Sequence, residues 1–288
     1  MTAGLPERLH THLRHLVGER HPHSSPERLT QAESYLAETF HTIGLSVTRH
    51  EFSALGGTYR NVVATFPSAG KLAEPALLIG AHFDTVEGSP GADDNASACA
   101  VLLEVARCLS GSAGDRPIHF VAFNLEEEDL LGSRAYTAHL KATGQDLLGA
   151  VVLECVGYAS RAEGSQQKPA GVPVPVPTVG DFLAVIGNDR ARLLVEAMLA
   201  ARTSVPELPL VPLLVPGCGA ALPDTRRSDH AAFWDCGLPA VMLTDTANYR
   251  NPHYHRATDT LETLDLDFMA KVAGAVTKAA QVLSGARE

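Results

Sequence analysis

The chain has 288 residues, 45% of them hydrophobic, and a formal net charge of -10 at pH 7. A chain of this size buries a large core, and α/β proteins often reach this length as one domain, so we expect a single domain over residues 1–288. The acidic balance and the scattered basic residues leave no electrostatic footprint for a phosphate backbone, so nucleic acid is excluded as an expected partner.

The N-terminal segment, residues 1–25, is interrupted by charged residues and histidines. It lacks the apolar centre of a secretory signal, and no later run is long enough to span a membrane. We therefore expect a soluble, cytoplasmic protein without a membrane partner. The cysteines are odd in number and widely spaced, which fits reduced thiols better than a disulfide framework or a cysteine-based zinc site; they are Cys99, Cys108, Cys155, Cys218 and Cys236.

The first predicted elements are a helix and an antiparallel edge. Residues 26–43 have the pattern of an amphipathic helix. The segments "SVTRHEF" and "RNVVATF" that follow are expected to be extended and to pair with each other. Short apolar runs come next, and because their hydrophobicity is continuous rather than alternating, they predict strands covered on both faces. These runs are residues 76–82, 118–124, 150–155, 182–188 and 240–246.

Helical patterns lie between the apolar runs. One begins after a cap at Asn95 or Ser97, and another covers residues 194–199. The alternation of strands and helices predicts an α/β fold, with a mixed, mostly parallel central sheet flanked by helices on both faces. Residues 161–180 are rich in proline and glycine, so we expect a long loop there, either a lid or a passive insertion.

Histidines and acidic residues gather where the predicted strands end. Ligands of open α/β sheets bind outside the carboxyl ends of the strands, so these side chains are expected to meet. Several carboxylates at one apolar site would repel one another unless cations neutralise them or they take up protons, and bound metal is the simplest resolution. The residues are His82, Asp84, Glu126, Glu127, Glu128, Asp129, Glu154, Asp229, His230, His253 and His255.

The chemistry of this set indicates which metal it would bind. Imidazole and carboxylate ligands without thiolate suit Zn²⁺, with Mn²⁺ or Co²⁺ as competitors. The set also fits two metals, because in two-metal hydrolases one carboxylate usually bridges a pair of divalent ions about 3.5 to 4 Å apart. The sequence therefore predicts a metal site at the carboxyl edge of the sheet.

Five short motifs resemble a known family. The stretches "HFD", "PGADDNAS", "EEEDLLGS", "SDHAAFW" and "YHRATDT" occur in the order found in the di-zinc aminopeptidase family, which also contains glutamate carboxypeptidases and glutaminyl cyclases. The resemblance runs from about residue 26 to the C-terminus. A lone "HxD" would be weak, but five motifs in order make chance agreement improbable. The resemblance implies a zinc-exopeptidase-like fold.

The resemblance also implies two zinc ions per chain and a set of ligands for each of them. His82 and Glu154 would bind one metal. Glu127 and His255 would bind the other, and Asp93 would bridge the two.

Supporting roles follow from the same motifs. Asp84 would orient His82 by accepting the ring N–H that does not face the metal. Glu126, the first glutamate of "EExxLLGS", matches the general base. In the family the peptide bond between the two aspartates, here Asp93 and Asp94, is cis, and Asp94 would contribute to this backbone geometry.

Three positions depart from the family's pattern. Glu154 stands where aminopeptidases of the family more often have aspartate, so the extra methylene would shift that metal or alter its affinity. Cys99 and Asp129 both replace a glycine, and we expect the chain to tolerate both.

Two further positions have competing interpretations. The pattern "YHxxxDT" selects His255 as the ligand and leaves His253 as a pocket-lining or surface histidine. Asp229 either caps the helix that follows it or meets the substrate amine.

The activity that the resemblance implies is that of a metal-dependent exopeptidase, specifically a zinc aminopeptidase acting on a peptide with a free N-terminus. A metal-activated water would attack the N-terminal peptide bond, with Glu126 as general base. The alternatives are a glutaminyl-peptide cyclase with a single zinc, a carboxypeptidase for acidic peptides, and an inactive binding module on a peptidase fold. The intact "GADDNAS" favours two metals, and the filled ligand positions favour an enzyme. The sequence indicates no oligomeric state.

Overall fold

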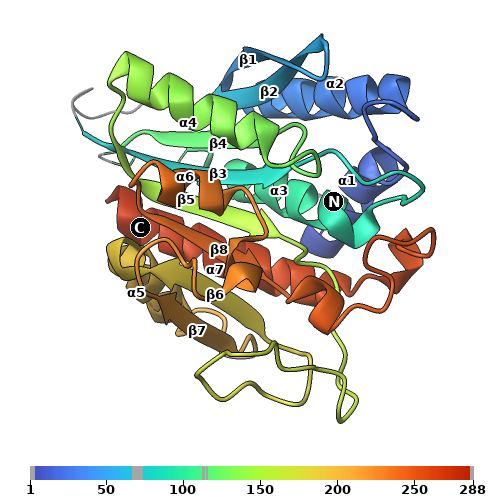
Figure 1. Ribbon diagram of the computed structural model, residues 1–288, viewed down its shortest axis with the longest axis vertical. Coiled ribbons are helices and arrows are strands. Elements are labelled where there is room, and N and C mark those ends of the chain that lie inside the picture. The colour runs from blue at the N-terminus through green and yellow to red at the C-terminus, as the bar shows by residue number, and fades with distance from the viewer. Residues whose placement is uncertain (1–3, 67–73, 112–113, 115, 286–288) are drawn as a thin grey trace.

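A computed structural model describes residues 4–66, 74–111, 114 and 116–285. Within these residues the chain forms one eight-stranded sheet with the strand order β1-β2-β4-β3-β5-β8-β6-β7 (Figure 1). The strands are β1 (Ser46–Ala54), β2 (Gly57–Thr65), β3 (Ala76–His82), β4 (Ile118–Phe123), β5 (Leu147–Glu154), β6 (Leu183–Asn188), β7 (Leu210–Val215) and β8 (Ala240–Thr244). Each apolar run expected to be a strand overlaps one, although β5 begins at Leu147, three residues before the expected run 150–155.

The sheet is mixed and mostly parallel, which confirms the prediction. Parallel pairs join β3 to β4, β3 to β5, β5 to β8 and β6 to β7. Antiparallel pairs join β1 to β2, β2 to β4 and β6 to β8, and the first of these is the expected edge, with Val47 opposite Ala64. Strand β7 was not predicted because Pro212 interrupts it, but a proline is compatible with its place at the edge of the sheet.

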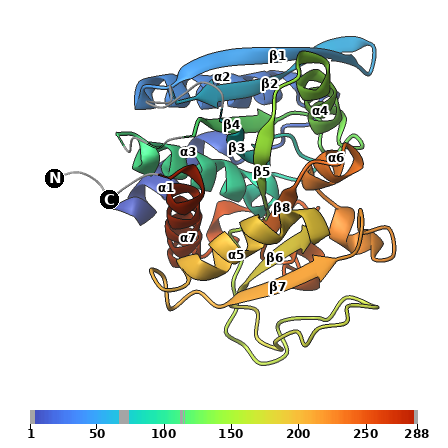
Figure 2. The same ribbon diagram turned by 90° about the vertical axis from the view of Figure 1, so that its left-hand side faces the viewer.

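Helices cover both faces of the sheet, as expected (Figure 2). Helices α1, α2, α3, α5 and α7 pack on one face, and α4 and α6 pack on the other. Their bounds are α1 (Leu5–Leu16), α2 (Pro26–Ile43), α3 (Ala98–Leu109), α4 (Leu131–Thr143), α5 (Arg192–Ala201), α6 (His230–Asp235) and α7 (Leu266–Ser284). Among the described helices, none is long and apolar enough to cross a membrane.

The central strand β3 shows why a continuous apolar run was needed. All of its residues are buried. Leu77 and Ile79 belong to the core cluster of one face, whereas Leu78 belongs to the cluster of the other. Successive side chains of a strand point to opposite faces, so a strand covered on both sides needs apolar residues at every position.

Residues 161–180 form a loop without helix or strand, as predicted. An antiparallel bridge between Ser160 and Gly180 joins its two ends. The buried Gln166 anchors the loop to the C-terminal part of the chain, because its side-chain oxygen accepts a hydrogen bond of 2.9 Å from Arg250 Nε. The loop is therefore closed at its base.

A buried acid links α1 to α3. Glu104 of α3 is fully buried and accepts hydrogen bonds from Arg8 Nε at 2.9 Å and His12 Nε2 at 3.1 Å, both on α1. Arg107 donates to the same carboxylate from within α3. Burial raises the pKa of Glu104, but the hydrogen bonds from His12, Arg107 and Arg8 outweigh it and lower this pKa to about 2.

We expect Glu104→Gln to lower the free energy of unfolding by about 3 kcal/mol, because breaking a buried ion pair leaves charged partners uncompensated. Since the pKa of Glu104 lies below its unfolded value of 4.5, its stabilisation is present above pH 4.5 and is lost as the pH falls towards 2. Urea unfolding of both proteins at several pH values measures this. The exposed Glu196→Gln is the control, and a difference between wild type and Glu104→Gln that grew on acidification would contradict the prediction.

Candidate metal centre and catalytic site

The strands deliver the predicted residues to one edge of the sheet. His82 is the last residue of β3, and Glu154 is the last residue of β5. Glu126 and Glu127 follow β4, and His255 lies in the loops after β8. Parallel pairing of β3 with β4 and β5, and of β5 with β8, sets these strand ends side by side.

Asp94 lies at the centre of this cluster. Its Oδ1 is 3.3 Å from Nε2 of His82, and its Oδ2 is 3.0 Å from Nε2 of His255. Glu154 Oε2 lies 3.3 Å from the same nitrogen of His82, and Glu127 Oε1 lies 3.3 Å from that of His255. The structure thus brings together two imidazole–carboxylate groups that share Asp94.

Asp93, which the sequence motifs assigned as the bridge, makes other contacts. Its Oδ1 accepts the N–H of Gly157 at 2.8 Å, and its Oδ2 accepts Nδ2 of Asn251 at 2.7 Å. Both oxygens are therefore engaged by loops outside the histidine cluster. Asp94, and not Asp93, is therefore the aspartate that faces the two histidines. The expected position of the cis peptide bond is also corrected, because it lies at Asp94–Asn95 rather than between the aspartates.

The backbone turn explains this shift. Gly91 adopts a left-handed φ of 59°, and a side-chain carbon there would lie 2.3 Å from the carbonyl oxygen of Asp94. Only glycine permits such a close approach. The tight turn, and not the order of the two aspartates in the sequence, decides which carboxylate faces the histidines.

Buried polar atoms test whether the site fits a metal. Nε2 of His82, both carboxylate oxygens of Asp94 and Oε1 of Glu127 are buried, and the described residues give them no hydrogen-bond partner. Buried polar atoms are normally paired, and clustered carboxylates repel unless a cation neutralises them. Imidazole and carboxylate donors suit Zn²⁺ and related divalent ions. The residues present therefore fit divalent metal ions.

Asp84 supports three members of the cluster at once. Its Oδ1 is 3.4 Å from Nδ1 of His82, the ring nitrogen that does not face Asp94. The same carboxylate accepts the backbone N–H groups of Glu126 and Glu127, each at 3.0 Å. Asp84 therefore lies where the predicted orienting residue should be, and it also holds the backbone of the glutamate pair.

Glu126 lies beside the histidine of the first group. Its Oε2 is 3.8 Å from His82 Nε2, and only 9% of the residue is exposed. Burial raises the pKa of Glu126 well above its usual range; His82 opposes this rise, and Glu154 and Glu127 add to it. A buried carboxylate with a raised proton affinity suits a general base.

Asp229 does not take the capping role, one of its two expected roles. It precedes α6, but its side chain makes no capping hydrogen bond. Its carboxylate is fully buried among the acidic residues of the site. Burial raises the pKa of Asp229 to about 7, and the carboxylates of Asp84 and Glu154 add to this rise.

The structure also adds residues that the motifs did not indicate. Ser228 Oγ donates to Glu154 Oε2 at 2.8 Å, and Asn251 holds Asp93 as described. Ser228 stands inside the "SDHAAFW" motif, so its position was a usable signal. His253 bonds through Nδ1 to Thr258 at 2.9 Å and is not part of the cluster.

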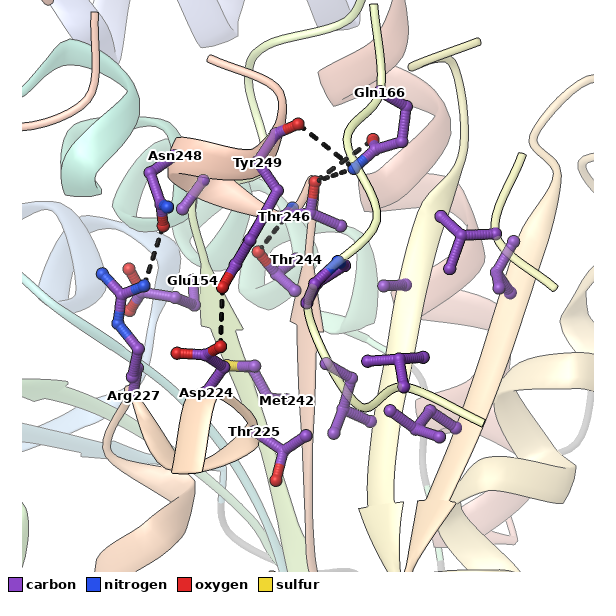
Figure 3. Close-up of a pocket in the computed structure, with 18 of the residues that line it drawn as sticks. Glu154, Gln166, Asp224, Thr225, Arg227, Met242, Thr244, Thr246, Asn248 and Tyr249 are labelled. Atoms are coloured by element: carbon purple, nitrogen blue, oxygen red, sulfur yellow. Dashed lines mark hydrogen bonds between the residues drawn. The ribbon is translucent and has the colours of Figure 1, made fainter. Parts of the chain in front are cut away.

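A pocket opens beside Glu154 (Figure 3). Tyr254, next to the predicted ligand His255, also lines it. Its empty volume is about 800 Å³ when the space open to solvent is counted. Polar side chains lie towards Glu154, where Arg227 donates to Asn248 at 2.8 Å. The rest of the lining is mostly apolar and includes Val172, Val174, Val176, Phe182, Ala184, Ile186, Val211, Leu213 and Met242. Because three of these valines come from the 161–180 loop, that loop is a wall of the pocket and not a passive insertion.

Comparison with known proteins agrees with this geometry. The model of peptidase family M28 matches residues 61–177 and 219–280. The chain belongs to peptidase family M28, which confirms the resemblance drawn from the motifs.

Two relatives and one solved structure show what this chain is similar to. The chain is 35% identical to the uncharacterized protein YfbL of Escherichia coli, covering 94% of this chain and 86% of YfbL. It is 30% identical to a probable leucine aminopeptidase of Trichophyton verrucosum, covering 74% of this chain and 55% of that protein, or about half its length. The crystal structure of the Legionella pneumophila LapA aminopeptidase shares the fold, with a TM-score of 0.78 and 20% identity over 98% of this chain and 72% of LapA.

Proposed function

We propose that this peptidase is a zinc aminopeptidase that removes the N-terminal residue of peptides. The observation that carries the proposal is Asp94, whose two buried oxygens face the ring nitrogens of His82 and His255 and have no hydrogen-bond partner among the described residues. One shared carboxylate flanked by two imidazole–carboxylate groups is the arrangement expected of a two-metal hydrolase. The similarity to a probable leucine aminopeptidase supports the same activity.

Two Zn²⁺ ions fit the donor set. Asp94 with His82 and Glu154 would hold one, and Asp94 with Glu127 and His255 would hold the other. When bound, Zn²⁺ would polarise the scissile carbonyl and make water a better nucleophile at neutral pH.

Glu126 is the proposed general base. Its carboxylate, next to His82, would take a proton from the attacking water and return it to the nitrogen of the leaving amine. Asp84 would keep Glu126 in place, because it holds the backbone N–H of that residue. The peptide bond is thus cleaved by water without a covalent enzyme intermediate.

The pocket defines the proposed substrate. Its apolar lining fits a large apolar side chain on the first residue of the peptide, since such a side chain leaves water when it enters. Glu154 lies both in the metal cluster and in the lining of the pocket, so the free amine of that first residue would lie near Glu154. Free cysteines at all five positions support a reducing compartment, and we propose the cytoplasm.

A substrate panel tests the proposal. Aminoacyl arylamides with leucine, phenylalanine, alanine, lysine and glutamate are compared with their N-acetyl forms, together with free and C-terminally blocked peptides. We expect cleavage only where the α-amine is free, because an acetylated nitrogen is uncharged and is a poor metal ligand. We expect faster cleavage of leucyl and phenylalanyl substrates, because the pocket lining is apolar.

The other outcomes of the panel are equally informative. Cleavage of the acetylated set, or strict dependence on a free C-terminus, would refute the aminopeptidase assignment. An N-terminal glutaminyl peptide is included, and its ring closure without hydrolysis of the other substrates would establish a glutaminyl cyclase instead.

A further inference from the structure

Two buried charged side chains act on the backbone around Asp94. Arg20 is fully buried, and its guanidinium donates to the carbonyl oxygens of Pro90 at 3.0 Å and Gly91 at 2.9 Å. Its Nε donates to the carbonyl oxygen of Phe83, directly after β3, at 2.6 Å. Arg20 therefore fixes the start of the turn against the strand that carries His82.

Asp259 holds the other side of the same turn. It is fully buried, and its Oδ1 accepts the N–H of Asp93 at 3.0 Å while its Oδ2 accepts the N–H of Asp94 at 3.1 Å. Its own carbonyl oxygen accepts the N–H of Ala92 at 3.2 Å. Three successive N–H groups of the turn thus donate hydrogen bonds to a single residue, Asp259.

The place of Asp259 in the chain gives these bonds their significance. It lies four residues after His255 on the same loop, so it ties the loop that carries one proposed ligand to the turn that carries the shared one. Asp84 makes the same kind of contact with the amides of Glu126 and Glu127. Each pair of adjacent acidic residues in the site therefore has its backbone held by a separate buried aspartate.

We infer that Asp259 is a positioning residue that holds Asp94 in register with His255 and thereby sets the affinity of the site for zinc. This inference rests on the proposed function. A carboxylate suits the task because it offers one acceptor to each of two neighbouring N–H groups, and charged acceptors form the stronger hydrogen bonds. An asparagine would present one oxygen and one N–H donor, so one backbone N–H would face another donor.

Zinc affinity is the direct test. Zn²⁺ binding to the whole protein is measured by competition with a chelator of known affinity, for wild type, Asp259→Asn and Glu104→Gln. We expect Asp259→Asn to weaken Zn²⁺ binding by roughly 10- to 100-fold, the usual effect of losing a residue that orients metal ligands. With excess Zn²⁺, KM for a leucyl substrate should stay within about twofold, because Asp259 does not line the pocket.

Glu104→Gln separates positioning from general stability. It also removes a buried carboxylate, but one whose hydrogen bonds within the described residues come from Arg8 and His12 of α1 and Arg107 of α3. It should unfold more easily and bind Zn²⁺ as wild type does. Unchanged Zn²⁺ affinity in a folded Asp259→Asn protein, or an equal loss in Glu104→Gln, would overturn the inference.

A measurement on the wild-type protein covers the case in which Asp259→Asn does not fold. Hydrogen exchange of the Asp93 and Asp94 amides in the metal-free protein should be slow, since both are bonded to Asp259. Exchange as fast as in an exposed loop would overturn the inference. If wild type binds no Zn²⁺ at all, the proposed function fails, while the exchange of these amides still decides whether Asp259 holds the turn.

Discussion

Replacing Glu126 with glutamine is expected to slow turnover by roughly 10²- to 10⁴-fold, the usual contribution of a positioned general base. Glutamine has almost the same shape as glutamate but takes up no proton at neutral pH. The backbone of Glu126 is held by Asp84 through its N–H, which the substitution leaves intact. We therefore expect the fold and the metal content to remain as in wild type. Steady-state kinetics measures the loss of turnover, and elemental analysis measures the metal content.

Glu127→Gln is the matched control for that experiment. Glu127 and Glu126 are adjacent, equal in charge and held by the same aspartate, but Glu127 faces His255 and Glu126 faces His82. Glu127→Gln should lose bound metal, and excess Zn²⁺ should restore part of its activity. If metal were lost from the Glu126 variant and retained in the Glu127 variant, the two roles would have to be exchanged.

A second large effect is expected at Asp94. Changes to residues that only orient metal ligands already weaken metal binding by roughly 10- to 100-fold, so loss of the shared ligand in Asp94→Ala should exceed about 100-fold and abolish turnover. Both groups of the site use Asp94, so both metals should be affected. Chelator competition and elemental analysis after dialysis measure this loss.

Asp93→Asn is the comparison that separates the two aspartates. Asp93 is engaged by Gly157 and Asn251, so this change should lower the free energy of unfolding by roughly 1 to 3 kcal/mol, the cost of disturbing buried hydrogen bonds. Metal should stay bound to the folded protein. A variant at Asp93 that lost both metals while Asp94→Ala kept them would restore Asp93 as the bridge.

The site contains parts that could be predicted from the sequence and parts that could not, and the two aspartates belong to the second kind. Strands ending in His82 and Glu154 were predictable, because continuous apolar runs mark buried parallel strands and parallel strands end at one edge. Asp93 and Asp94 stand side by side in a run of small residues, where no apolar pattern sets the direction of a side chain. The left-handed Gly91 and the turn after it decide that direction, and both are properties of the folded backbone.

Arg20 and Asp259 were missed for a related reason. Their partners are backbone groups of a turn about 70 residues later and about 165 residues earlier in the chain. A hydrogen bond to a backbone group does not depend on the identity of the partner residue, so it leaves no paired pattern in a single sequence. Only the arrangement of the sheet brings these segments together.

The 161–180 loop has a consequence for how this protein can diverge from its relatives. The loop is closed at its base by the Ser160–Gly180 bridge and anchored by Gln166, while its valines line the pocket. The histidines and carboxylates of the metal cluster all lie on other parts of the chain. Exchange of the segment between residues 167 and 177 for a different sequence would therefore alter which peptides are accepted while leaving the catalytic residues intact. Substrate preference and catalytic chemistry can thus evolve separately.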